Sequence, residues 1–317
     1  MVACLGEVLI DFIAEQVGTL DKVHSFRRAP GGAPANVAVG IARLGVPCGF
    51  IGKVGADTFG AFLISTLKEN GVDTSALLQT PEAPTALAFV SRSESGDSHF
   101  LFYRNPCADT FLTESDLPQD WFRYLQFLHV GGVSLTREPS RTTTIQAAKL
   151  AKDNGARVTF DPNLRLALWS KDLSACREQM HALLAYTDIF LPSQEELLTI
   201  MATEDIEDAI VKTHRLGPSI VCVKRGVHGS LISEEKSEGD LRQFSQPPLD
   251  VEVVDTTGAG DGFDAGLIVG LVRGLSLEAA VKQGTAIASL VTTKLGAMTA
   301  LPSEHELESF LAECEGK

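Results

Sequence analysis

Short apolar runs alternate with amphipathic segments in the second half of the chain. Four such runs lie at residues 127–130, 157–160, 189–191 and 220–223. Segments with helical spacing of apolar residues lie between or after them, near 141–154, 173–185, 261–272, 277–293 and 303–313. Short apolar runs are typical of strands buried on both faces, and intervening helices indicate parallel βαβ units. The pattern predicts an α/β fold with a mostly parallel central sheet covered by helices.

The N-terminal part holds segments that do not fit this layering. Residues 14–28 contain no βα unit. Two later stretches alternate apolar and polar positions; they are 85–91 and 99–104, joined by a polar turn at 94–98. Alternation of this kind is typical of paired strands, so we expect a small separate β-sheet from about 14–28 and 85–104. No internal repeat or low-complexity linker interrupts the chain, so residues 1–317 are predicted to form a single domain.

A glycine-rich turn joins a predicted strand to a predicted helix. The valine-rich residues 251–254 favour a strand, and a helix is expected to begin at Asp261. Gly258 and Gly260 keep the turn clear of side chains, and the free N–H groups of a first helical turn suit a phosphate. Asp261 could accept a proton from an attacking hydroxyl. No GxxxxGK[ST] run occurs in the sequence, so a nucleotide would need this other anion-binding turn.

Polar residues follow several of the predicted parallel strands. Asp161 and Lys224 each come directly after an apolar run. The carboxyl ends of parallel strands share one edge of a sheet, where ligands bind in open α/β folds. We therefore expect Asp161, Lys224 and the 258–261 turn to lie in a single site.

The composition excludes several classes of function. Lys and Arg number 27 against 41 Asp and Glu, so the formal net charge is −14, and no basic tract offsets it. Such a chain repels nucleic acid, and no nucleic-acid partner is expected. No apolar run approaches the roughly 20 residues needed to cross a bilayer, and residues 1–13 lack a basic leader. We expect a cytoplasmic protein without a membrane partner, whose six scattered cysteines are buried free thiols.

Two long stretches together resemble the signatures of one enzyme family. Residues 31–45 read GGAPANVAVGIARLG, and residues 255–263 read DTTGAGDGF. They resemble the first and second signatures of the PfkB (ribokinase-like) sugar kinases, and the flanking residues 6–12 and 50–55 are most similar to fructokinases. The resemblance implies a ribokinase-like three-layer fold with a β-sheet lid. It also implies transfer of the γ-phosphoryl of ATP to the 6-hydroxyl of D-fructose, with Mg²⁺.

The resemblance also implies roles for individual residues at the sugar end. Asp261 would be the catalytic base, and the backbone amides of Gly258, Ala259 and Gly260 would stabilise the transferring phosphoryl. The residues implied to hold the sugar are Asp11, which we expect to end the first strand, with Gly31, Gly32 and Asn36. Strand alternation adds Phe102 and Arg104, which should share one face of the second lid strand.

A second group of residues is implied to bind the nucleotide and cations. The nucleotide residues are Asn163, Arg165, Lys224, Gly226 and Gly229, with Lys224 in a place where the family usually has Thr. Glu196 would order Mg²⁺ through water, although Ser193 replaces the family's Asn and Thr285 replaces an Asn beside the adenine. A possible K⁺ site would use Asp255 and Thr257 with carbonyls of Val291, Lys294 and Gly296.

Other interpretations of the same residues stay open at this stage. Asn36 could simply cap a helix, and the glycine turns could be ordinary turns. Tyr103, Arg104 and residues 161–165 also suit a 2-keto-3-deoxygluconate kinase, since a sugar acid needs a cation. A catalytically silent sugar-binding protein is a further alternative.

The small lid sheet also predicts an oligomeric state. A small sheet cannot bury apolar residues on both of its faces, which predicts a homodimer joined through Leu87, Phe89, Phe100 and Phe102.

Overall fold

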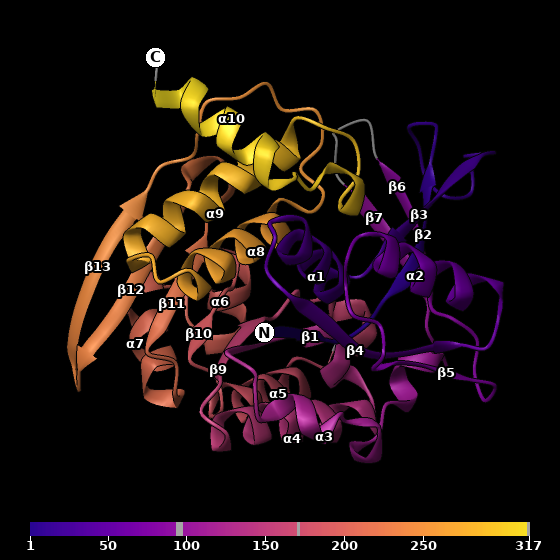
Figure 1. The fold of residues 1–317 in the computed structure, drawn as a ribbon, viewed down its shortest axis with the longest axis horizontal. Coiled ribbons are helices and arrows are strands. Elements are labelled where there is room, and N and C mark those ends of the chain that lie inside the picture. The colour runs from indigo at the N-terminus through magenta and orange to yellow at the C-terminus, as the bar shows by residue number, and fades with distance from the viewer. Residues whose placement is uncertain (93–97, 170–171, 316–317) are drawn as a thin grey trace.

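The computed structural model describes residues 1–92, 98–169 and 172–315 and contains two sheets (Figure 1). The large sheet has nine strands in the order β13-β12-β11-β10-β9-β8-β1-β4-β5. These strands are β1 (Val2–Leu5), β4 (Cys48–Gly55), β5 (Leu77–Thr80), β8 (Phe127–Gly131), β9 (Arg157–Asp161), β10 (Ile189–Phe190), β11 (Ile220–Lys224), β12 (Ser230–Ser237) and β13 (Asp240–Gln246). All neighbours from β11 to β5 pair in parallel, and only β12 and β13 are antiparallel. The predicted α/β fold with a mostly parallel sheet is confirmed.

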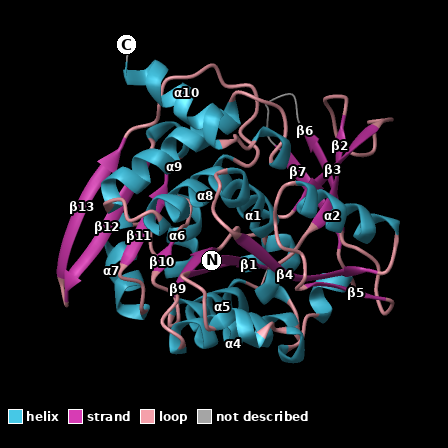
Figure 2. Ribbon diagram, in the orientation of Figure 1, coloured by secondary structure: helices cyan, strands magenta, loops and turns pink. Residues whose placement is uncertain are grey.

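Helices cover both faces of the large sheet, which gives three layers (Figure 2). The α-helices are α1 (Ala33–Arg43), α2 (Thr58–Glu69), α3 (Gln119–Phe122), α4 (Ser140–Asp153), α5 (Leu173–Leu184), α6 (Gln194–Met201), α7 (Ile206–Leu216), α8 (Ala259–Val272), α9 (Leu277–Thr292) and α10 (Glu304–Glu315). The central strand β1 shows how the layers form: Val2 and Cys4 enter the core shared with α1, α8 and α9, whereas Ala3 and Leu5 enter the core shared with α4 and α5. Strand alternation thus places two hydrophobic cores on opposite faces of one sheet.

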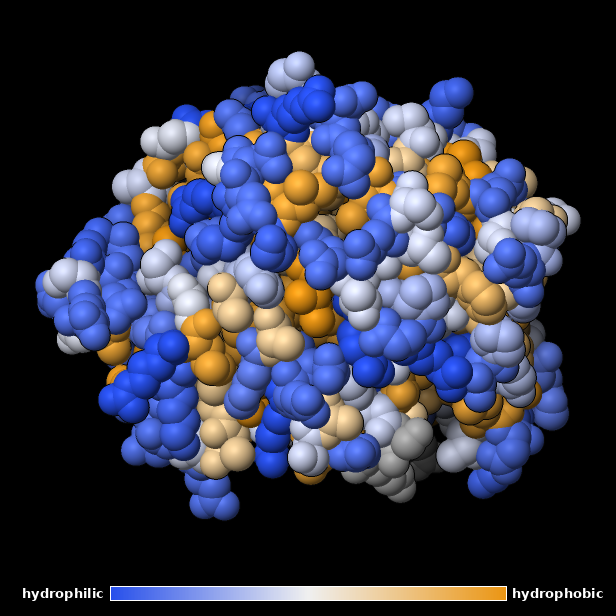
Figure 3. Space-filling model, turned by 90° about the horizontal axis from the view of Figure 1, so that it is seen from below, coloured by the Kyte–Doolittle hydropathy of each residue, from blue (hydrophilic) through white to orange (hydrophobic). Residues whose placement is uncertain are grey.

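The outer surface is mainly hydrophilic, with scattered apolar side chains, on the face seen in Figure 3. Isolated apolar side chains on a surface are common in globular proteins. Within the three described ranges, no helix has the length and apolar character needed to cross a bilayer. Cys4, Cys48, Cys107, Cys176 and Cys222 are buried free thiols.

The prediction of a strand at residues 251–254 is wrong. These residues have no regular secondary structure, and Val253 and Val254 are 58% and 50% exposed. Val254 and Asp255 both donate their N–H groups to the carbonyl of Thr292, at the end of α9. β-branched residues favour strands only where a neighbouring strand can pair with them, and here the neighbour is a helix end.

The small sheet is built from four strands in the order β3-β2-β6-β7. They are β2 (Leu9–Ala14), β3 (Phe26–Gly31), β6 (Leu87–Arg92) and β7 (Ser98–Tyr103). The predicted first lid segment, 14–28, is therefore misplaced, because it covers mainly the connection between β2 and β3. Asp11 lies within β2 of the small sheet and does not end the first strand. The predicted polar turn at 94–98 lies almost wholly outside the described residues.

Candidate active site

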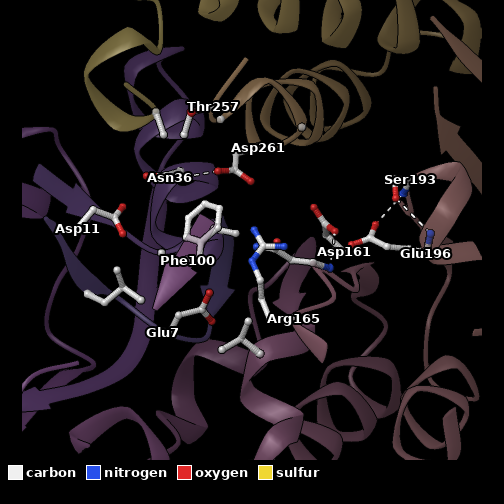
Figure 4. A pocket seen from close by; sticks show the side chains of 18 of the residues that line it. Glu7, Asp11, Asn36, Phe100, Asp161, Arg165, Ser193, Glu196, Thr257 and Asp261 are labelled. Atoms are coloured by element: carbon white, nitrogen blue, oxygen red, sulfur yellow. Dashed lines mark hydrogen bonds between the residues drawn. The ribbon is translucent and has the colours of Figure 1, made fainter. Parts of the chain in front are cut away.

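A cavity of about 340 Å³ lies between the small sheet and the carboxyl-terminal edge of the large one (Figure 4). Its wall comes from β2, β7, α1, the ends of β9 and β11, and the start of α8. The predicted site residues that line it are Asp11, Gly32, Asn36, Phe102, Asn163, Arg165, Glu196, Lys224, Gly226, Thr257, Gly258, Gly260 and Asp261. Most of the residues expected to form one site are thus brought together.

A second cavity, of about 540 Å³, opens beside the first. Its lining is mainly apolar and includes Val227, Leu249, Val253 and Phe263. The predicted residues Gly229 and Ala259 line this second cavity. Lys224, Gly226 and Gly260 line both cavities, so the two spaces meet at the start of α8. A small polar ligand and a larger, partly apolar ligand could therefore meet beside Asp261.

The turn before α8 explains why this helix starts where it does. Gly258 is the N-cap and has a φ of 82°, a left-handed conformation that favours glycine. A side chain there would also lie 2.7 Å from Ala297. Of the predicted phosphate-binding amides, that of Ala259 already donates to the carbonyl of Thr256. The helix start still directs a positive dipole end at the junction of the two cavities.

Asp261 lies in the first turn of α8 and meets α1 across the cavity. Its Oδ2 accepts a hydrogen bond of 2.7 Å from Nδ2 of Asn36, as Figure 4 shows. Burial raises the pKa of Asp261 to about 6; the Asn36 hydrogen bond opposes the rise, while the charge of Asp161 adds to it and Lys224 opposes it. A carboxyl with this pKa is mostly ionised at neutral pH and is a better proton acceptor than an ordinary aspartate.

Asp11 faces the same cavity from the small sheet. A side chain at Gly31 would collide with the Asp11 carboxylate, so the glycine leaves room for this group although Gly31 does not line the cavity. Burial raises the pKa of Asp11 to about 7, the Arg165 guanidinium lowers it, and the Asp261 charge raises it. The carboxyls of Asp11 and Asp261 therefore line the same cavity, Asp11 from the small sheet and Asp261 from α8.

Arg104 does not line this cavity, contrary to the prediction. The strand β7 ends at Tyr103, so the alternation that places Phe102 in the cavity does not continue to Arg104. Its guanidinium is buried, with Nη2 2.5 Å from Oδ2 of Asp109 and Nη1 donating to Oγ1 of Thr136. The charge of Arg104 is thus neutralised behind the cavity wall.

Lys224 lies between two carboxyl groups. Its Nζ is 2.9 Å from Oδ2 of Asp161 and 3.2 Å from Oδ1 of Asp264. Burial tends to lower the pKa of Lys224, but Asp161 and Asp264 outweigh it and raise that pKa above its ordinary value. Burial raises the pKa of Asp264 well above its ordinary value. Burial also tends to raise the pKa of Asp161, but the charge of Lys224 outweighs it and keeps that pKa below the ordinary value of an aspartate. The cluster thus pairs Lys224 chiefly with ionised Asp161.

The residues after β9 form the wall next to Lys224. Oδ1 of Asp161 accepts the N–H of Asn163, which is the turn expected for this sequence. Arg165 extends into the cavity with its guanidinium 5.2 Å from the centre of the Phe100 ring. A cation that is held against an aromatic ring and lines a cavity is suited to an anionic ligand.

Glu196 has a structural role in addition to its place in the cavity wall. Its Oε2 accepts the N–H of Ser193 and its Oε1 accepts the N–H of Leu164, so it closes a capping box at the start of α6. Each carboxylate oxygen keeps further lone pairs for a metal-bound water. Among residues 1–92, 98–169 and 172–315, no three His, Cys, Asp or Glu side chains group as a metal site. Any Mg²⁺ here would depend mainly on ligand phosphates and water, which Mg²⁺ accepts readily.

The proposed K⁺ residues are only partly brought together. Oδ1 of Asp255 accepts the N–H and the hydroxyl of Thr257, and its Oδ2 accepts the N–H of Gly296. The carbonyl of Val291 accepts the N–H of Lys294 in the last turn of α9, and the ammonium of Lys294 pairs with Glu306. Asp255 thus connects the turn before α8 to the loop at Gly296, next to the active site.

Several cavity residues were not predicted from the sequence as site residues. They are Glu7, Leu9, Ala33, Phe100, Val133, Ser193 and Ala297. Asp161 was located as a polar residue at the carboxyl end of a parallel strand. The same rule, extended by two residues, indicates Glu7, because β1 ends at Leu5.

The fold and the paired cavities define a carbohydrate kinase. The model of the family described as "pfkB family carbohydrate kinase" matches residues 1–304, so the chain belongs to this family. It is 40% identical over 98% of its length to probable fructokinase-6, chloroplastic, of Arabidopsis thaliana, covering 82% of that protein.

Solved structures have the same fold. A putative ribokinase II from E. coli in complex with ATP and Mg²⁺ superposes with a TM-score of 0.89 at 31% identity, over 98% of this chain and 99% of that one. A fructokinase double mutant from Vibrio cholerae O395, in the fructose-, ADP- and potassium-bound form, gives a TM-score of 0.85 at 34% identity, over 98% and 97% of the two chains. The expected ribokinase-like fold is confirmed.

Proposed function

We infer that this chain is an ATP-dependent fructokinase that phosphorylates the 6-hydroxyl of D-fructose. The observation that carries this inference is the junction of the two cavities at the start of α8, beside Asp261. The sugar would occupy the polar cavity under the small sheet, and the adenosine would occupy the more apolar one. The fructokinase similarity over nearly the whole chain supports the same substrate.

The arrangement suits an in-line transfer of a phosphoryl group. Asp261 accepts the proton of the 6-hydroxyl, whose oxygen forms a bond to the γ-phosphorus as the bond to the β-phosphate oxygen breaks. ADP leaves, and fructose 6-phosphate remains. The dipole of α8, with Lys224 and Arg165, stabilises the negative charge on the transferring group. Mg²⁺, when bound to the nucleotide, neutralises phosphate charge.

A neutral sugar fits the polar cavity better than a sugar acid does. The carboxyls of Glu7, Asp11 and Asp261 all line its sugar end, and Arg104 is already paired with Asp109. A substrate carboxylate there would face three acidic groups, of which Asp261 is mostly ionised at neutral pH, whereas a sugar hydroxyl can donate a hydrogen bond to each of them. This favours fructose over 2-keto-3-deoxygluconate.

We predict a higher kcat/KM for D-fructose than for D-ribose or 2-keto-3-deoxygluconate in a coupled assay of ADP formation. A missing hydroxyl leaves buried polar groups unpaired, which selects strongly between sugars. A higher kcat/KM for the ketodeoxy acid would contradict the assignment. Saturable sugar binding without ADP formation from any sugar would instead indicate a silent binding protein.

We also predict that activity requires Mg²⁺ and is higher in K⁺ than in Na⁺. The cavity offers Glu196 for metal-bound water, and Asp255 ties the α8 turn to the Gly296 loop where a K⁺ would act. Initial rates with excess EDTA test the first statement. Equal rates in KCl and NaCl at matched ionic strength would contradict only the second.

The outer face of the small sheet supports the homodimer that the sequence predicts. Phe12 stacks on Phe89 at 5.1 Å, and Phe26 and Tyr103 pack edge-on against Phe89 at 5.4 and 5.5 Å. Leu101, which pairs with Phe89 across the strands, is 46% exposed, and Tyr103 is 60% exposed. Of the four residues first expected in the interface, Phe100 and Phe102 instead line the cavity. We propose that a second copy covers the outer face.

Two adjacent substitutions separate the two faces of the lid. Leu101→Asp should convert the dimer to a monomer, because it places a charge in the apolar contact, whereas Phe100→Asp should keep the dimer. Light scattering at micromolar concentration measures the mass of each. A monomeric native chain, with or without fructose and ATP, would refute the dimer.

The cytoplasmic location expected from the sequence stays a prediction.

A further inference from the structure

Glu7 lies where the chain passes from the large sheet to the small one. It follows β1 and precedes β2, and β1 is flanked by β4 on one side and β8 on the other. The chain order therefore reverses at β1, and ligands in such sheets bind in the crevice at this reversal. The Glu7 side chain points from the floor of the cavity toward the space below Asp11 and Phe100 (Figure 4).

The Glu7 carboxyl is buried but incompletely satisfied. The residue is 2% exposed, and its Oε2 has no hydrogen-bond partner within the described parts of the chain. Burial raises the pKa of Glu7 to about 7, while the Arg104 guanidinium and the backbone N–H groups of Glu7 and Ala33 lower it. Leaving a buried carboxyl oxygen unpaired is costly, so such an atom in a cavity wall indicates a ligand.

Neighbouring groups narrow the chemistry of that ligand. Oδ1 of Asn36, on the opposite wall, is also buried without a partner in the described residues. Two unpaired acceptors near Asp11 disfavour an anion. Among the described residues, no three His, Cys, Asp or Glu side chains are grouped so that they could hold a metal ion. A hydroxyl supplies the missing donor, and it can also accept a hydrogen bond when a carboxyl is protonated.

We propose that Glu7 is a sugar-binding residue whose Oε2 accepts a hydrogen bond from one hydroxyl of a neutral sugar in the cavity. This proposal rests on the proposed function, because the sugar is the ligand expected there. It assigns Glu7 a direct contact in addition to those expected of Asp11, Gly32 and Asn36. Arg104, which is paired with Asp109, is close enough to lower the pKa of Glu7, whereas the charge of Asp109 raises it.

The test compares binding of fructose and its mono-deoxy analogues to the wild type, Glu7→Ala and Glu7→Gln by calorimetry without ATP. Loss of one hydrogen bond to a buried carboxyl should weaken fructose binding roughly 5- to 150-fold in Glu7→Ala. One analogue, lacking the hydroxyl that Glu7 contacts, should bind the wild type and Glu7→Ala equally. Glu7→Gln, which keeps an acceptor and the side-chain volume, should weaken binding less. The KM for ATP should be unchanged in both.

Asp109→Asn is the matched control, because it alters the partner of Arg104 without touching the cavity lining. It should leave the ranking of the analogues unchanged. The proposal would be overturned if Glu7→Ala weakened the binding of fructose and of every analogue by the same factor, or if Asp109→Asn changed the ranking of the analogues as Glu7→Ala does. Either result would show that Glu7 supports the cavity wall without contacting the sugar. Failure of the fructokinase assignment would appear differently, as absent fructose turnover by the wild type. The comparison is then made on the deoxy series of whichever sugar the wild type phosphorylates.

Discussion

Asp261→Asn should lower kcat by about 10²- to 10⁴-fold while leaving fructose affinity little changed. The amide keeps the shape of the carboxylate but cannot accept the proton of the attacking hydroxyl. Calorimetric binding of fructose, together with kcat from ADP formation, separates the two effects. Asn36 donates to Asp261 in the native protein and can still donate to the oxygen of the new amide, so the cavity wall should stay intact. A fall in kcat of less than about tenfold would contradict the role of Asp261 as base.

The pH dependence offers a second measurement of the same group. Because the pKa of Asp261 is about 6, the base is ionised above that pH, and kcat/KM should fall as the pH drops through about 6. The residual activity of Asp261→Asn should lack this decrease. A variant that retained the same acid limb would show that another carboxyl is responsible; Asp11 and Glu7, each with a pKa of about 7, are the candidates in the cavity wall.

The sequence predicted the second half of the fold well because its strands are buried on both faces. The strands β8, β9 and β11 read as short apolar runs, and the polar residues that end β9 and β11, Asp161 and Lys224, line the cavity as expected. Burial on both faces leaves a strong signal in the residue types themselves. The location of the site could therefore be predicted before its geometry was known.

The N-terminal strands show what periodicity cannot reveal. Residues 2–14 are one nearly continuous apolar stretch, yet they form two strands in different sheets, with Glu7 between them. A change of sheet leaves no mark on alternation, so Asp11 was placed at the end of the wrong strand and Glu7 was missed. The same limit explains Arg104, where alternation was extended one residue beyond the end of β7. Side-chain direction at a strand end depends on tertiary contacts such as Asp109.

Asp264 was missed for a different reason. It lies one helical turn after Asp261, where an acidic residue in an early turn is normally exposed to solvent. Its side chain is instead fully buried beside Lys224. The packing of α8 against the end of β11 brings this carboxyl to Lys224, although Asp264 itself lines neither cavity.

Lys224→Met should destabilise the fold by about 3–5 kcal/mol, because removing one partner of a buried ion pair leaves an uncompensated charge. Asp161 is the carboxylate left without its cation: it is 5% exposed and lies 2.9 Å from Nζ of Lys224. Urea unfolding without ligands measures the change. The double variant Lys224→Met/Asp161→Asn should recover most of the lost stability, because the unpaired charge is gone.

The deficit of Lys224→Met should also depend on pH, and the sign follows from Asp161. With Lys224 present, the pKa of Asp161 is held below its ordinary value, so the native pair is intact from pH 5 to 8. Without Lys224, burial should raise that pKa, and the penalty for the ionised carboxylate is relieved as the pH falls. Lys224→Met should therefore be closer to wild-type stability at pH 5 than at pH 8. An equal deficit at both pH values, with no recovery in the double variant, would show that the lost stability does not come from an uncompensated charge on Asp161.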